Sequence, residues 1–74
     1  MPYLRGLKRA RERRLMTMRE LAARSGVGTS TIVHLESGQQ EARMSTARRL
    51  AAALNVTPDE LLGEQQPGNE IAAA

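Results

Sequence analysis

Apolar residues recur every three or four positions along most of this 74-residue chain, the period of helices with one buried face. Thr17 with Glu20, and Thr57 with Glu60, have the spacing of a capping box, which marks the start of a helix. Glycines are placed to end two of the helical stretches. The pattern predicts an all-α fold of five helices with no strand: residues 3–14, residue 17 to a turn at Gly26, 29–36, 45–54 and 57–63, with 39–43 as a polar loop.

The chain is long enough for one small domain. Residues 1–63 are predicted to fold, whereas residues 64–74 lack an amphipathic pattern and are expected to be a disordered tail. A core of this size is marginal. Because Tyr3 is the one aromatic residue, the core must consist of aliphatic and methionine side chains.

The stretch 17–36 predicts two short helices joined by a tight turn. Leu21 marks the inner face of the first helix, and Ile32 and Leu35 mark that of the second. Gly26 lies at the joint, where glycine permits a positive φ and a sharp change of direction. This is the plan of the helix-turn-helix, whose second helix enters the major groove of DNA.

The opposite face of residues 29–36 is short, polar and uncharged, unlike most solvated helix faces, which carry Lys and Glu. Small hydroxyls can hydrogen-bond to base edges, and a valine methyl can pack on a thymine methyl. In the alternative reading, the hydroxyl residues merely fill a short helix, the valine contacts a neighbour and the histidine is solvated. The face consists of Ser30, Val33, His34 and Ser37, with Thr29 at its N-terminal shoulder.

The charge is unevenly distributed. Residues 1–63 hold all 11 Lys and Arg against six acidic residues, a net charge of +5, whereas residues 64–74 carry −2. A basic domain attracts polyanions such as nucleic acid or an anionic membrane, although the charge could also serve solubility. The basic run 8–14 is a poor membrane-surface helix, because its apolar face lacks large residues beyond Leu4 and Leu7.

Other chemistry finds little support. The chain has no cysteine for a disulfide or thiolate metal site, and its single histidine lacks a carboxylate cluster around it. Ser30 and Ser37 have no activating base, so we expect no catalysis, no metal and no cofactor. Residues 2–14 carry too much charge for a signal peptide, and no apolar run approaches a membrane span. We therefore expect a cytoplasmic protein without a membrane partner.

In these features the chain resembles the lambda-repressor and Cro-like helix-turn-helix family, often called XRE-type, over residues 4–63. The resemblance implies a compact five-helix fold, sequence-specific binding to double-stranded DNA and a homodimer on a palindromic operator. The residues that carry it are Arg11, Thr17, Glu20, Leu21, Ala22, Gly26, Val27, Ser30, Thr31, Ile32, Glu36, Gly38, Leu50, Ala51, Leu54, Asn55, Val56, Asp59, Glu60, Leu61 and Leu62.

The resemblance also implies residue roles. Base contacts fall on Thr29, Ser30, Val33 and His34, and backbone contacts on Arg19, Gly28, Ser37 and Arg43. Glu36 lies just off the core direction of its helix and needs a cation, for which Arg11 is the candidate; the family's buried ion pair falls on the same two residues. The chain departs from the family at Leu15, Met18, Gly28, Glu41 and Ala42, where the family commonly has Gly, Gln, Ser or Thr, Asn and Pro.

Adjacent residues on a helix diverge by about 100°, so Leu61 and Leu62 cannot both face one small core. We expect one of them to be available to a two-fold mate, together with Asn55 and Val56. The resulting hypothesis is a DNA-binding transcriptional regulator that acts as a repressor. The alternative is an antitoxin-like interaction module that binds a partner protein as well as DNA.

Overall fold

The computed structural model describes residues 2–63, which form five helices and contain no strand. The all-α expectation is therefore confirmed; the expected disordered tail, residues 64–74, lies outside the described residues. The helices are α1 (Leu7–Arg13), α2 (Met18–Ser25), α3 (Thr29–Glu36), α4 (Met44–Leu54) and α5 (Pro58–Leu62).

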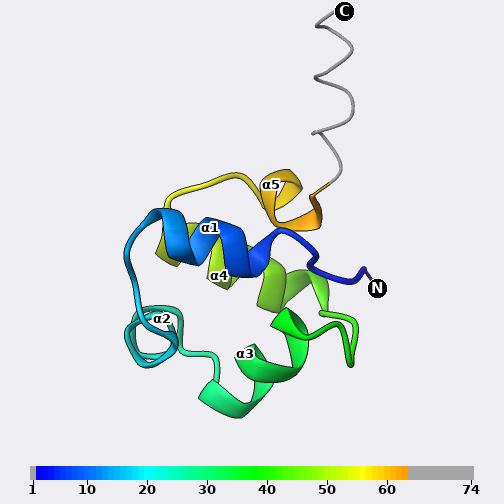
Figure 1. Ribbon diagram of the computed structural model, residues 1–74. Helices are drawn as coiled ribbons and strands as arrows, with labels where there is room; N and C mark the ends of the chain where they lie inside the picture. The colour runs from blue at the N-terminus through cyan, green and yellow to red at the C-terminus, as the bar shows by residue number, and fades with distance from the viewer. Residues whose placement is uncertain (1, 64–74) are drawn as a thin grey trace, which may run out of the picture.

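The helices pack around one core, to which α4 contributes four buried residues. Helix α4 contacts α2 and α5, α1 contacts α5 and α3, and α2 contacts α3. In Figure 1, α1 and α5 form the upper part of the domain, while α2 and α3 lie at its lower edge. The second helix of the helix-turn-helix pair is thus presented at one side of the molecule.

The core is aliphatic, as the composition requires. Burying each large aliphatic side chain contributes about 1.5–3 kcal/mol relative to leaving it in water. No polar or charged residue of the described part is fully buried. The largest fully buried side chains are Leu4, Leu7, Leu21, Ile32, Leu35, Leu50, Leu54 and Leu61.

The start of α2 and the turn after it follow the local sequence. Thr17 Oγ1 accepts from the Glu20 amide at 3.0 Å, and the Thr17 amide donates to Glu20 Oε1 at 2.9 Å, which completes the predicted capping box. Gly26 ends α2 with φ 78°, the positive value expected of the joint. Ser25 Oγ donates to the Leu21 carbonyl and accepts from the Val27 amide, so it stabilises the turn.

The first helix starts later than predicted, at Leu7 instead of residue 3. Residues 2–6, here called the N-terminal strap, form no helical turn of their own; they lead into α1 and also bond to distant segments. The Pro2 carbonyl accepts from the Ala42 amide at 2.7 Å, and the Gly6 amide donates to the Leu61 carbonyl at 2.8 Å. A Cβ on Gly6 would collide with the Glu60 carbonyl, so glycine permits this close approach.

The second predicted capping box is wrong. Thr57 has the extended backbone of an N-cap and Pro58 follows it, but the Thr57 side chain makes no capping bond. The Glu60 amide, which the box would need, donates instead to the Thr57 main-chain carbonyl at 3.0 Å. Gly63 ends α5 with φ 70°, as its position predicted.

Candidate nucleic-acid interface

The outer face of α3 is open to solvent over its whole length. Ile32 and Leu35 are fully buried beneath it, so the helix cannot rotate without losing core contacts. Val33 is 41 % exposed, so its methyl groups are open to contact from outside the domain. We call this surface the reading face; its exposed members are Ser30, Val33, His34 and Ser37, with Thr29 exposed beside them.

The two ends of α3 differ chemically. Gly28 is the N-cap, with φ −63° and ψ 148°, and it has no side chain to cap the first-turn amides. Those amides are therefore available to an anion. At the other end, Ser37 Oγ donates to the His34 carbonyl at 3.2 Å, so its proton already has an acceptor and its lone pairs remain open.

Arg11 and Glu36 are brought together across 25 residues. Arg11 Nε donates to Glu36 Oε2 at 2.7 Å, and Nη2 donates to Oε1 at 3.1 Å. The side chains are only 12 % and 4 % exposed. The hydrogen bonds that Arg11 donates to Glu36, and the negative charge of that carboxylate, raise the pKa of Arg11 above its ordinary value, although burial opposes this. Arg11 therefore stays charged and fixes the end of α3 to α1.

A further Arg11 bond includes the turn between α1 and α2 in this junction. Arg11 Nη1 donates to the Met16 carbonyl at 2.9 Å. One guanidinium thus joins the α1–α2 turn, α1 itself and the last turn of α3. This side chain adds a polar tie to the core packing of Ile32 and Leu35, which already holds α3 in place.

The basic candidates for backbone contact are exposed. Arg19 is the second residue of α2, and Arg43 is the N-cap of α4. Arg43 shares a hollow of about 300 Å³ with Thr31 of α3, Thr46 of α4 and Glu41 of the connecting loop. The structure thus places Arg43 beside α3, with a carboxylate as its near neighbour in the sequence.

The four candidate dimer residues lie near α5 but differ in burial. Leu61 is fully buried, whereas Leu62 is half-buried against the edge of the core. Val56 is also half-buried, and Asn55 is exposed with φ 58° as the C-cap of α4. Leu62, not Leu61, is therefore the adjacent leucine with apolar surface to spare.

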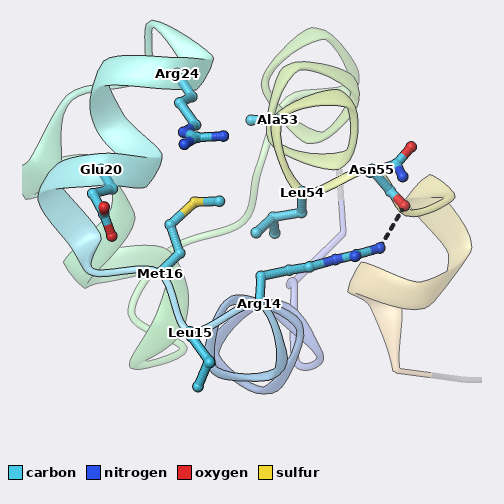
Figure 2. A pocket seen from close by; sticks show the side chains of 8 residues that line it. All are labelled: Arg14, Leu15, Met16, Glu20, Arg24, Ala53, Leu54 and Asn55. Carbon is cyan, nitrogen blue, oxygen red and sulfur yellow. Dashed lines mark hydrogen bonds between the residues drawn. The ribbon is translucent and has the colours of Figure 1, made fainter.

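The main chain of Asn55 is also bonded to the end of α1. Arg14 Nη2 donates to the Asn55 carbonyl at 3.1 Å, the bond drawn in Figure 2. The residues in this view surround a hollow of about 270 Å³ between the end of α1, α2 and the end of α4. Small-molecule sites usually measure about 300–1,000 Å³ and are mostly apolar, so this hollow does not have the form of a ligand pocket.

Leu15 lies at the rim of the same hollow in an uncommon conformation. Its φ is 53°, in the left-handed region, and 91 % of the residue is exposed. Glycine adopts this conformation without strain. Leu15 therefore has a left-handed backbone at the position where the resembling family commonly has glycine.

The described residues support neither a metal site nor a membrane-spanning helix. Residues 2–63 contain no cluster of three His, Cys, Asp or Glu side chains that could hold a metal ion. None of their helices has both the length and the hydropathy needed to cross a membrane.

A family model described as helix-turn-helix matches residues 7–61, which cover α1 to the fourth residue of α5. The chain belongs to this helix-turn-helix family, of the XRE and Cro type. Members bind DNA and are not enzymes, so DNA is the partner of this domain and transcriptional regulation its general role. No curated protein and no solved structure matches the chain.

Sequence reasoning about the helix-turn-helix domain missed the N-terminal strap. Its fold brings Tyr3 and Arg5 beside Gly38, immediately after the reading face. Two signals were present: Pro2 has no amide to donate, and glycine at position 6 is a poor interior helix residue. Neither signal indicates which distant segment the strap contacts.

Proposed function

We propose that this protein is a transcriptional repressor that reads a palindromic operator with α3 in the major groove. The observation that carries the proposal is the reading face, an exposed, uncharged surface on a helix whose other side is locked into the core. Its exposed side chains are short and uncharged, whereas most solvated helix faces carry Lys and Glu.

Direct readout is assigned to four side chains of α3. Ser30 and Thr29 offer hydroxyls that donate to or accept from base edges, and His34 adds a ring nitrogen. Val33 offers methyl groups that fit the C5-methyl group of thymine. These contacts would discriminate among bases at about 1–3 kcal/mol for each good pair.

Phosphate contacts are assigned to groups around this face. Gly28 offers the free amides at the start of α3, and Ser37 offers its hydroxyl at the end. Arg19 and Arg43 offer exposed guanidinium groups, which bind phosphate through paired N–H donors. Such contacts hold the protein in register and carry no sequence information themselves.

The proposed active form is a homodimer, because a palindrome presents two identical half-sites. Leu62, Val56 and Asn55 would contribute to the two-fold interface, with Leu61 packed beneath it. Half-sites would then lie about 34 Å apart, one helical turn of DNA. The alternative is an antitoxin-like role with a protein partner. It would be favoured if substitutions in α3 leave the base preference unchanged in the following experiment.

The test measures binding of the full chain to a randomised-site DNA library at two salt concentrations. We expect Val33→Ser to relax the preference for thymine at one operator position and to leave the salt dependence nearly unchanged. Arg43→Ala is the matched contrast: it should weaken binding to selected and random duplexes together and lower the salt slope by about one. Neither side chain belongs to the core, so both variants should melt like the parent.

Variants of Ser30 and His34 extend the same measurement to the rest of the reading face. Each should change the preferred base at its own position. If substitutions at Ser30, Val33 and His34 all retain the parent preference, α3 does not read this DNA. Co-purification with a protein partner would then become the decisive measurement.

A further inference from the structure

The N-terminal strap holds two unassigned side chains beside the end of α3. Tyr3 is 43 % exposed and Arg5 is exposed; with Gly38 they line a shallow hollow of about 160 Å³. The strap lies next to the loop that connects α3 to α4, at the end of the domain where the chain enters in Figure 1.

The strap is held in place by the fold. Leu4, between the two side chains, is 1 % exposed and belongs to the core. The main-chain bonds of Pro2 and Gly6 fasten its two ends to Ala42 and Leu61. Tyr3 and Arg5 therefore start from fixed backbone positions, and binding through them loses less conformational entropy than binding through a free arm.

The position of the hollow relative to α3 identifies its ligand. Gly38 directly follows Ser37, so the hollow lies just beyond the C-terminal end of the reading face. A recognition helix contacts base edges with its N-terminal residues. An eight-residue helix is about 12 Å long, close to the width of the major groove, about 12 Å. With α3 laid across the groove, its far end comes close to the phosphates that border the groove.

The charge of the hollow fits the same ligand. Among residues 2–63, its lining consists of Tyr3, Arg5 and Gly38, none of which is a carboxylate. Within residues 2–63, Arg5 has no ion-pair partner, whereas Arg11 is paired with Glu36. A guanidinium and a phenol together offer charged and neutral donors to phosphate oxygens.

We propose that Tyr3 and Arg5 form a phosphate-binding site for the DNA backbone, at the end of α3 opposite to Gly28. This inference rests on the proposed function, because it takes α3 as the helix in the groove. With Gly28 and Arg19 near the start of α3, the two side chains border the reading face at both of its ends. The site adds affinity and register, without any preference for sequence.

The test compares arginine variants of the full chain on two fluorescein-labelled duplexes, the best duplex from a randomised library and its shuffled counterpart. Affinity is measured between 50 and 200 mM salt, about the range over which phosphate contacts are strongly screened. Arg5→Ala retains the Cβ that packs near Gly63, so the fold should be preserved, which a thermal melt checks. Arg9→Ala is the matched control, an exposed arginine on the outer side of α1.

We expect Arg5→Ala to lower the salt slope by about one on both duplexes, and Arg9→Ala to lower it clearly less. Tyr3→Phe removes only the hydroxyl, so it should weaken both complexes a few-fold with an unchanged slope, because a neutral donor releases no counterion.

Two results would overturn the assignment. Equal salt slopes for Arg5→Ala and Arg9→Ala would reject the strap site. If Arg43→Ala, measured alongside, still lowers affinity for both duplexes, the proposed DNA-binding mode itself stands. Absence of salt-dependent binding by the parent chain would reject both the site and the proposed function.

Discussion

The guanidinium of Arg11 on α1 donates two hydrogen bonds, of 2.7 and 3.1 Å, to the carboxylate of Glu36, the last residue of α3. Both side chains are almost withdrawn from water. Charged groups in such a position are costly to leave unpaired. The pair therefore couples the stability of the domain to the orientation of the helix that carries the reading face.

Glu36→Ala should destabilise the domain because it leaves the Arg11 guanidinium without its carboxylate. We expect a loss of about 3 kcal/mol, the lower end of the range for breaking a buried pair, since Arg11 keeps its bond to the Met16 carbonyl. Thermal unfolding followed by circular dichroism measures it, with the exposed Glu41→Ala as control. A midpoint like that of the control would mean that the pair contributes no stability.

Leu15→Gly should stabilise the domain. A left-handed conformation costs a non-glycine residue about 1–2 kcal/mol, whereas glycine loses about 0.5–1 kcal/mol more backbone entropy on folding. Since Leu15 is 91 % exposed, little burial is lost, and we expect a net gain of about 0.5–1 kcal/mol. Chemical denaturation measures it, and Leu15→Ala keeps the strain. If Leu15→Ala gains as much stability as Leu15→Gly, the gain comes from removing an exposed apolar side chain and not from relief of backbone strain.

Features that depend on neighbouring residues could be predicted from the sequence. The capping box of Thr17 and Glu20 and the turn at Gly26 use groups within a few positions of each other. The burial of Ile32 and Leu35, and the exposure of Val33 opposite to them, follow from helical period alone. The expected DNA contacts themselves require a bound duplex and stay predictions.

Features that depend on distant main-chain groups could not be predicted. The late start of α1 is set by bonds to Ala42 and Leu61, and main-chain bonds leave no side-chain pattern in the sequence. Ala42 is 2 % exposed although its stretch, 39–43, was predicted as a polar loop. Thr57 and Thr17 have the same local pattern, yet only Thr17 forms a capping box, because the Glu60 amide finds a carbonyl instead.

Leu62→Ser should separate dimerisation from folding. Leu62 is half-buried, so its loss should leave a folded chain, whereas the fully buried Leu61 serves as the contrast: Leu61→Ser should unfold it. Sedimentation with a palindromic duplex should show two parent chains per duplex and predominantly one Leu62→Ser chain. A strict one-chain complex for the parent would reject the dimer, and an unchanged stoichiometry for Leu62→Ser would place the interface elsewhere.

The last prediction concerns Glu41, an acidic residue beside a proposed phosphate contact. It is exposed and shares a hollow with Arg43, so its carboxylate would lie close to the DNA backbone that Arg43 is proposed to bind. Like charges at about 4 Å repel by about 1 kcal/mol in water, and salt screens this over a Debye length of about 10 Å at 0.1 M. Glu41 is therefore expected to weaken DNA binding of every sequence alike.

Glu41→Gln removes this charge and keeps the shape of the side chain. We expect it to raise affinity for selected and shuffled duplexes by up to about fivefold at low salt, with the gain shrinking as salt increases and base preference unchanged. Glu12→Gln makes the same change of net charge on the outer side of α1 and should raise affinity less. Fluorescence anisotropy titrations at several salt concentrations measure both. An equal gain in the two variants would mean that Glu41 acts only through the net charge of the domain, and that the phosphate backbone does not pass Arg43.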